Sequence, residues 1–273
     1  MILLHVTVVA LYGLTAYALW PATAGRAASS RLYDRMPVGA VTWLVPLALI
    51  LHGFLGWHAV ATPEGLDLSL VNAVSVVAGL VAAVAWVSGL LATLPAIGTV
   101  VLPVAAVASL LPAFIVNAHR FSYGDDTLAA VHVAIALVAY AMFLVAALQA
   151  LVLMGLEKRL RRRTLDPESV ATPPLLTLER FLFRLIAVGF LLLTLTLASG
   201  ILFTEQLFGK ALVFNHKSVF SVLGWLTFGA LLIGRWRYGW RGRIALRWII
   251  AGTVFVFLAY LGSKFVLEVI LKR

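Results

Sequence analysis

Residues 128–154 read LAAVHVAIALVAYAMFLVAALQALVLM, a long run without a single Asp, Glu, Lys or Arg. The hydrocarbon core of a bilayer is about 30 Å thick, and a helix of about 20 apolar residues crosses it. The run is followed directly by GLEKRLRRR at residues 155–163. This stretch therefore predicts a transmembrane helix that leaves the bilayer into a strongly basic loop.

The same pattern recurs along the whole chain. Of the 273 residues, 63% are hydrophobic and only 12% are charged, which is too apolar for a soluble domain. We predict an all-α, polytopic membrane bundle of about eight transmembrane helices, with residues 1–273 forming a single domain. The predicted spans are Ile2–Trp20, Pro37–Ala61, Ser69–Ala92, Pro95–Val116, Leu128–Met154, Leu182–Phe203, Val219–Ile233 and Trp248–Ile270.

The distribution of Lys and Arg predicts the orientation of these spans. Of the 21 Lys and Arg residues, 15 follow the first, fifth and seventh spans, 14 of them in the connections and Arg184 in the first turn of the sixth span. Basic residues resist translocation, so these connections are expected in the cytoplasm and both termini in the periplasm of a bacterial inner membrane. The longest connection, residues 155–181, is then a cytoplasmic basic loop, in which Asp166-Pro167-Glu168 has the form of a helix start.

Two segments depart from this simple pattern. The seventh predicted span is short, and the apolar stretch 207–214 before it is predicted to lie on or dip into the membrane. After the first span, Ala22-Thr23-Ala24 resembles a signal-peptidase site, but no Lys or Arg precedes the apolar run as a signal peptide requires. We therefore predict a retained first helix, with a cleaved signal peptide as the alternative.

Composition also excludes several functions. The net charge of +10 follows from short basic loops beside apolar spans, so we expect contact with the lipid bilayer and no nucleic-acid binding. The chain has no cysteine, which excludes disulfides, thiolate metal sites and thiol chemistry. It has no P-loop and no Ser-His-Asp or His-Glu-x-x-His pattern, so we expect no enzymatic activity. Few carboxylates lie deep in the spans, which argues against a transporter.

The histidines gather at the edge of the spans that faces away from the basic loops. His132 lies about one turn inside the fifth span, with Ala136 and Tyr140 on the same helix face. His216 lies at the start of the seventh span. Imidazoles at the apolar end of a helical bundle are suited to ligating haem iron. For His132 the alternative is an interfacial histidine that keeps one nitrogen in water.

The other histidines are weaker candidates. His52, near the middle of the second span, is either a ligand or a packing residue hydrogen-bonded to a neighbour. His58 lies about 120° around the same helix, so one face cannot present both. His119 is expected in a solvated loop, and His5 lies near the start of the first span.

The C-terminal half resembles the cytochrome c assembly protein superfamily, and in size the small inner-membrane branch described as HemX-like or YpjD-like. The similarity covers about Leu128 to Leu271 and is weaker before it. It is carried by LERF at 178–181, GFLLLT at 189–194, ASG at 198–200, residues 225–234, GWRGR at 239–243, AYLGS at 259–263, and His132-Val133-Ala134 with Tyr140.

This resemblance implies a role in handling haem during cytochrome c biogenesis. In the family, an outer loop carries a Trp-rich haem-binding motif ending in Asp-Pro-Lys-Glu, between two external histidines. Here residues 204–218 contain no Trp and end in Asn215-His216-Lys217-Ser218, and no second external histidine follows the last span. Only His132 carries over directly.

The resemblance thus implies a haem b site with His132 as one iron ligand and His216 as the natural second, His52 and His58 being rivals. The implied partners are haem and other cytochrome c maturation or membrane proteins. The alternative function is a non-catalytic, HemX-like membrane regulator or scaffold without resident haem, which contacts its partner through the basic loop.

Overall fold

The computed structural model describes residues 1–23, 40–62, 65–92, 95–115, 127–161, 175–208 and 216–270. Within these ranges, eight helices are long and apolar enough to cross a membrane, which confirms the predicted all-α polytopic bundle. In chain order the elements are α1 (Ile2–Thr23), α2 (Ala40–Val60), β1 (Ala61–Thr62), β2 (Gly65–Leu66), α3 (Leu70–Ala92), α4 (Pro95–Phe114), α5 (Thr127–Arg161), α6 (Leu175–Phe208), α7 (His216–Tyr238) and α8 (Gly242–Phe257).

The last helix changes its winding near the C-terminus. After α8 the chain makes a π-helical turn, η1 (Leu258–Gly262), a short α-helical turn, α9 (Ser263–Phe265), and a second π-helical turn, η2 (Val266–Ile270). The Tyr140 hydroxyl of α5 donates a hydrogen bond to the Val256 carbonyl, just before η1 begins. The Val256 carbonyl thus accepts a hydrogen bond from another helix at the point where the α-helix changes to a π-helical turn.

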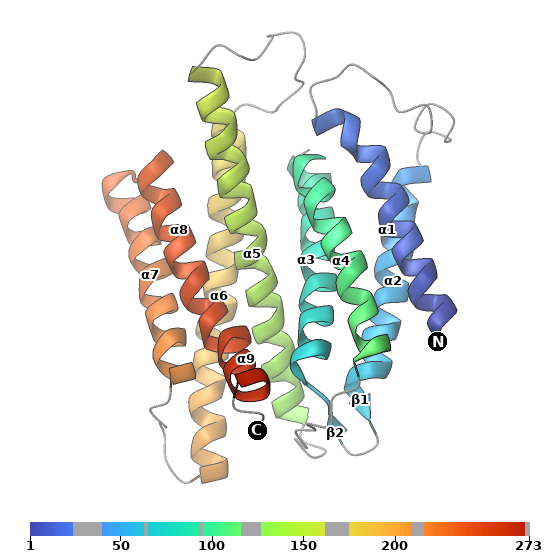
Figure 1. Ribbon diagram of the computed structural model, residues 1–273. Coiled ribbons are helices and arrows are strands. Elements are labelled where there is room, and N and C mark those ends of the chain that lie inside the picture. The colour runs from blue at the N-terminus through green and yellow to red at the C-terminus, as the bar shows by residue number, and fades with distance from the viewer. Residues whose placement is uncertain are drawn as a thin grey trace.

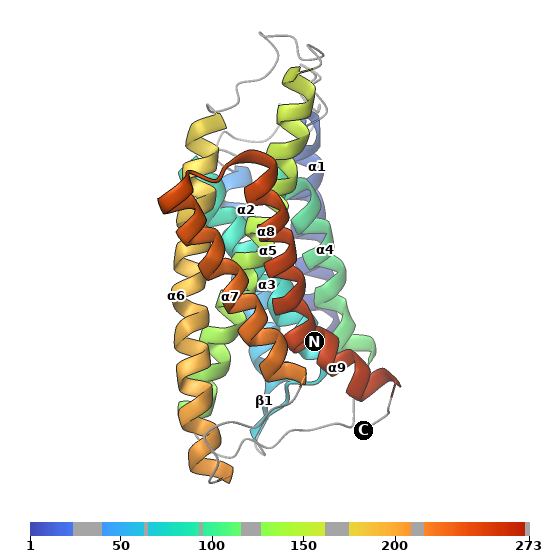
Figure 2. The ribbon, with the colours of Figure 1, turned by 90° about the vertical axis from the view of Figure 1, so that its left-hand side faces the viewer.

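The helices form two groups that meet along α3 and α5 (Figure 1). In the first group α4 packs against both α1 and α3, and α1 also packs against α2. In the second, α5 packs against α6 and α7 against α8, and Figure 2 shows α6, α7 and α8 together on one side. Contacts of α5 with both α3 and α8 hold the two groups together.

Both termini lie at the same end of the bundle (Figure 1). We call it the terminus end; it comprises the starts of α1, α3, α5 and α7, the ends of α2, α4 and α6, and η2. The opposite end, the basic end, holds Arg235, Arg237, Arg241 and Arg243 around the α7–α8 turn. That the terminus end faces the periplasm is the prediction made by the Lys and Arg distribution.

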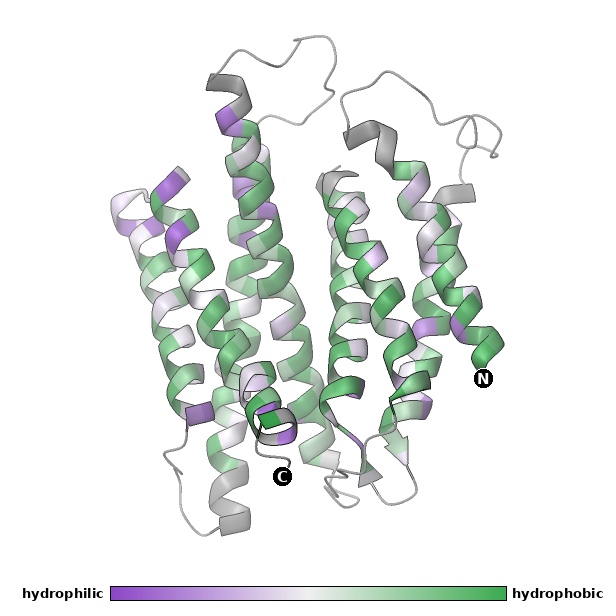
Figure 3. Ribbon diagram, viewed as in Figure 1, coloured by the Kyte–Doolittle hydropathy of each residue, from purple (hydrophilic) through white to green (hydrophobic). Residues whose placement is uncertain are grey.

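The sides of the bundle are apolar along their length, as the hydropathy colouring in Figure 3 shows. Many large side chains point outward there, including Trp43, 76% exposed, and Leu202, 63% exposed. A soluble bundle buries such residues, whereas lipid solvates them at little cost. The exposed apolar surface is therefore that of a membrane protein.

Helices α6 and α7 are longer than the spans predicted for them. The predicted seventh span, Val219–Ile233, is too short: α7 runs from His216 to Tyr238 and has 23 residues. Its polar first and last turns are helical as well, so the apolar run marks only the middle of the helix. The same reason explains why α6 begins at Leu175 rather than Leu182.

The basic tip predicted beyond the fifth span is helical as far as Arg161. The predicted helix start at 166–168 lies outside the described residues. So does most of the predicted membrane-dipping stretch 207–214, of which the last turn of α6 includes Leu207 and Phe208.

The second group packs around stacked aromatic rings. Phe143 of α5 and Phe228 of α7 lie face to face with ring centroids 3.9 Å apart. Each ring lies against a glycine: a Cβ at Gly189 would come within 3.1 Å of Phe143, and one at Gly252 within 2.9 Å of Phe228. Small residues thus let four helices approach closely, as is common in membranes. This packing fixes α5 and α6 side by side, which positions the site described next.

Candidate functional site

His132 lies near the start of α5 and faces α6 at the terminus end. Its ring is half-buried, and its Cε1 would lie 3.3 Å from a Cβ at Gly200. The ring therefore rests against α6 at a position where any other residue would crowd it. Nδ1 of His132 lies 2.8 Å from the Ser199 hydroxyl oxygen.

This hydrogen bond sets the tautomer of His132. The single hydroxyl proton of Ser199 is donated to the Leu195 carbonyl at 2.7 Å, with the Thr196 carbonyl at 3.2 Å as a second acceptor. The Ser199 oxygen therefore accepts from the Nδ1–H of His132. The lone pair of the neutral ring is then on Nε2, which has no hydrogen-bond partner among the described residues. A neutral imidazole with one nitrogen oriented by a neighbour is the form that binds metals.

His52 is held in a different way. It is 2% exposed, and both ring nitrogens have partners from other helices: Nδ1 lies 3.2 Å from the Tyr12 hydroxyl and Nε2 lies 3.1 Å from the Ser75 hydroxyl. The ring also packs on Gly79, where a Cβ would approach it to 3.2 Å. This is the arrangement of the packing alternative, and it leaves neither nitrogen for iron.

The other histidines are dispersed. His58 is exposed at the end of α2, with its ring edge-on to Phe54 at 4.5 Å. His216 is exposed as the first residue of α7. His5 is buried, and its Nδ1 lies 2.6 Å from the Ser109 carbonyl, joining α1 to α4. His119 lies outside the described residues. Over the described ranges, no three His, Cys, Asp or Glu residues gather to hold a metal ion.

Basic and aromatic residues that the sequence did not single out come together between the start of α7 and the last helical segments. Lys217, the second residue of α7, is close enough to His132 for its charge to act on the ring. The Lys217 Nζ lies 5.7 Å from the centre of the Tyr260 ring, and the Lys264 Nζ lies at the same distance from that ring. The signal that could have revealed this was the spacing of Tyr260, Lys264 and Glu268, which repeats every four residues and so lines one helix face.

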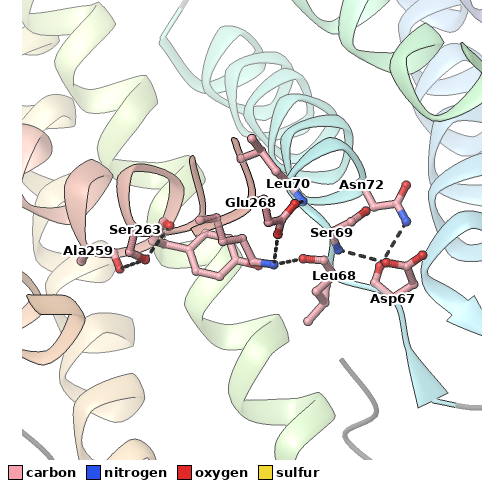
Figure 4. A network of polar contacts seen from close by, with 10 residues as sticks. Asp67, Leu68, Ser69, Leu70, Asn72, Ala259, Ser263 and Glu268 are labelled. Atoms are coloured by element: carbon pink, nitrogen blue, oxygen red, sulfur yellow. Dashed lines mark hydrogen bonds and ion pairs between the residues drawn. The ribbon is translucent and has the colours of Figure 1, made fainter. Parts of the chain in front are cut away.

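Lys264 and Glu268 belong to a polar network that joins the end of the chain to the start of α3 (Figure 4). Lys264 donates to the Leu68 carbonyl and lies 3.3 Å from the Glu268 carboxylate. Glu268 in turn accepts from the Leu70 backbone N–H at 2.7 Å. We call this network the C-terminal clasp. It holds Lys264 near Tyr260, whose ring packs edge-on against Tyr140 of α5.

Two cavities lie apart from His132. One of about 370 Å³ lies between α2, α3 and α5, is lined mostly by apolar side chains and includes His52 in its wall. The other, of about 290 Å³, lies between α5, α6 and α8 at the basic end and is lined by Glu157, Glu179 and Arg243 besides apolar residues. Neither has His132 in its lining.

Haem is the cofactor that the resemblance implies, and its needs can be compared with these residues. His132 would fit as one ligand of the iron, since its Nε2 has no partner among the described residues and its tautomer is fixed by Ser199. Among the described residues, no other histidine contacts His132 or is hydrogen-bonded to it. The residues present therefore fit one protein ligand to the iron.

Comparisons with known proteins agree with the resemblance. The family described as cytochrome C assembly protein matches residues 41–271. The inner membrane protein YpjD of Escherichia coli strain K12 is 32% identical over 269 residues, which cover 86% of this chain and all of that protein. The cytochrome c biogenesis protein CcsA of Trichormus variabilis is 32% identical over 103 residues, 36% of this chain and 29% of that protein.

CcsA of Prochlorococcus marinus strain MIT 9303 is 34% identical over 85 residues, which cover 31% of this chain and 27% of that protein. No solved structure matches the chain. The family match extends across seven of the eight spans and includes His132, Ser199 and Lys217. The chain therefore belongs to the cytochrome c assembly protein family.

Proposed function

We propose that this protein holds or passes haem at the periplasmic face of the bacterial inner membrane during cytochrome c biogenesis, with His132 as an axial ligand of the iron. Family membership and the CcsA relatives support the role in cytochrome c biogenesis. The name of the Escherichia coli relative supports the inner membrane as its location. The proposed role is binding and transfer, without catalysis.

The observation that carries the proposal is the hydrogen bond between His132 and Ser199. It orients the ring and keeps the proton on Nδ1, so that Nε2 is ready to bind a metal without first losing a proton or a partner. His52 offers no such nitrogen, because Tyr12 and Ser75 occupy both of its positions.

The absence of cysteine from this chain limits how it could hold haem. Without cysteine, no thioether bond can form, so the haem would be held by ligation and packing alone, as haem b is. Bound haem would supply an iron centre that accepts imidazole nitrogen. His216, exposed at the start of α7, is the proposed second ligand, and His58 is its rival.

The test is an absorption spectrum of protein purified from haem-replete cells. We expect a Soret band that His132→Ala weakens strongly and that His216→Ala weakens if His216 is the second ligand. His52→Ala should leave the Soret band of the folded protein unchanged, because it removes an imidazole that has no free nitrogen, and a thermal melt checks that this variant is folded. A wild-type protein without a Soret band, both as purified and after addition of haem, would rule the proposal out.

A second candidate is a membrane regulator or scaffold that works without haem. It is favoured by the absence of Trp from residues 204–218 and by the basic end, where Arg235 is fixed by Glu179 at 2.9 Å. Its test is crosslinking from the basic end to a partner protein, together with complementation by a variant lacking His132 and His216. Loss of complementation in that variant would count against it.

A further inference from the structure

The ammonium groups of Lys217 and Lys264 both lie over the ring of Tyr260. The Nζ atoms of Lys217 and Lys264 each lie 5.7 Å from the centre of Tyr260. The two ammonium groups come from different helices, α7 and α9, and are near enough to act on each other electrostatically. Like charges this close repel, especially beside the hydrocarbon of a membrane, so their juxtaposition calls for a compensating anion.

The described carboxylates compensate only one of the two lysines. Glu268 pairs with Lys264 at 3.3 Å and also accepts the Leu70 N–H. Asp67 accepts the Ser69 N–H at 3.0 Å and lies near enough to Lys264 to act on its charge. Lys217, within the described part of the chain, contacts no carboxylate and is stabilised by the Tyr260 ring. The uncompensated charge is therefore that of Lys217.

The charge of Lys217 also acts on the ring of His132, the proposed metal ligand. A neutral imidazole nitrogen next to an uncompensated ammonium is complementary to a ligand that carries a metal ion and a carboxylate. Haem is such a ligand, since its iron lies within the macrocycle and its two propionate carboxylates project from one edge.

We propose that Lys217 binds a carboxylate of the tetrapyrrole whose iron His132 ligates, so that the site selects tetrapyrroles with free carboxylates. This inference rests on the proposed function. The C-terminal clasp holds the ammonium group of Lys264, which adds a second positive charge near Tyr260. Lys217, exposed and free of the clasp, is the residue that contacts the ligand.

The experiment compares two ligands that differ only at the carboxylates. Purified haem-free protein in neutral detergent is titrated with ferric haem and with its dimethyl ester, and the Soret band is followed. Wild type is expected to bind the free acid about ten-fold more tightly than the ester, because a hydrogen bond to a charged group contributes that much. Lys217→Met should lose this preference by weakening the free acid alone, and Lys217→Arg should keep most of it.

Lys158→Met is the matched control, because it removes an exposed lysine at the basic end of α5 and should leave both affinities unchanged. A thermal melt of each variant shows whether it is folded. If wild type binds haem and its ester equally well, the inference is overturned while the proposed function stands. The inference is also overturned, and the proposed function stands, if the folded Lys217→Met variant still prefers haem over its ester. A wild-type protein that binds neither ligand contradicts the proposed function itself.

An anionic lipid headgroup is the other source of a negative charge for Lys217. Repeating the titration with phosphatidylglycerol added to the detergent separates the two. If Lys217 serves haem, the preference for the free acid persists. If it is abolished by the lipid at concentrations near those of the protein, Lys217 is a lipid site and the inference fails.

Discussion

At the scale of single residues, the number of partners on each imidazole separates the histidines better than their depth does. His52 and His132 both lie on apolar helices, and the sequence alone left both as candidates. The structure gives His52 two hydroxyl partners and His132 one. The partners come from helices 23 to 67 residues away along the chain, so no local pattern could have revealed them.

Ser199 is predicted to tune haem binding without touching the haem. Ser199→Ala removes the acceptor of the His132 Nδ1–H, so the ring is free to rotate and to place its proton on either nitrogen. Losing a partner of this kind typically lowers metal affinity about 10-fold or more. Haem titration followed at the Soret band measures the change.

Ser221→Ala is the control for that experiment, because the Ser221 hydroxyl likewise donates to a carbonyl of its own helix but is not bonded to His132. Equal haem affinities for Ser199→Ala and wild type would show that the tautomer of His132 does not matter.

His52 is predicted to matter for stability. His52→Ala breaks the chain of hydrogen bonds from Tyr12 to Ser75 and leaves a void against Gly79. The lost bonds and the void together should lower the free energy of unfolding by about 2–3 kcal/mol. Unfolding in mixed micelles with increasing SDS measures this.

Tyr12→Phe should lower the same free energy by less, because it removes one bond and leaves the ring in place. If His52→Ala unfolds like wild type, the buried network has no structural role.

At the scale of elements, the C-terminal clasp has the clearest consequence. A carboxylate at the N-terminus of α3 meets the unpaired N–H groups and the positive end of the helix dipole. Glu268 supplies that carboxylate from the opposite end of the sequence, at 2.7 Å from the Leu70 nitrogen. It thereby acts as a cap for α3 and as the partner of Lys264.

Glu268→Gln is predicted to destabilise the fold by about 1–2 kcal/mol, because it retains the size of the side chain and removes the charge that serves both contacts. Lys264→Met should cost less when introduced after Glu268→Gln than alone, since the two groups are partners. A double-mutant cycle on unfolding free energies gives the coupling. Additive effects of the two substitutions would contradict the clasp.

The elements also show where prediction from sequence is limited. Hydropathy found all eight spans, because each needs a long apolar run to cross lipid. It misplaced the ends of α6 and α7, because polar residues continue a helix into the interface as readily as apolar ones. It could not indicate the π-helical turns after Phe257, which accompany a tertiary contact from Tyr140.

At the scale of the whole molecule, topology is the prediction that most affects function. The chain has no cysteine, so each introduced cysteine is a unique label. Thr62→Cys, at the terminus end, should react with a membrane-impermeant maleimide in intact cells whose outer membrane has been made permeable. Arg241→Cys, at the basic end, should react only after the inner membrane is opened. The reverse pattern would place the His132 site in the cytoplasm.

The candidate site could be predicted from sequence in part. The family resemblance identified His132, and the comparisons confirm the family. Ser199 of α6 contacts His132, and Lys217 of α7 lies over the ring of Tyr260 in η1. Only the packing of these segments in the bundle brings such residues together. Which distant helices pack together depends on the folded bundle and cannot be predicted from local patterns in a single sequence.

The clasp also constrains when the molecule can become complete. Glu268 is separated from its partner Leu70 by 198 residues, so the ribosome synthesises the cap of α3 only after every other span has been made. Until then α3 enters the bilayer without that cap, and Lys264 is not yet beside Tyr260. A nascent chain that stalls before α8 has been made therefore contains His132 but lacks the C-terminal clasp, so the clasp can form only late in the insertion of these helices.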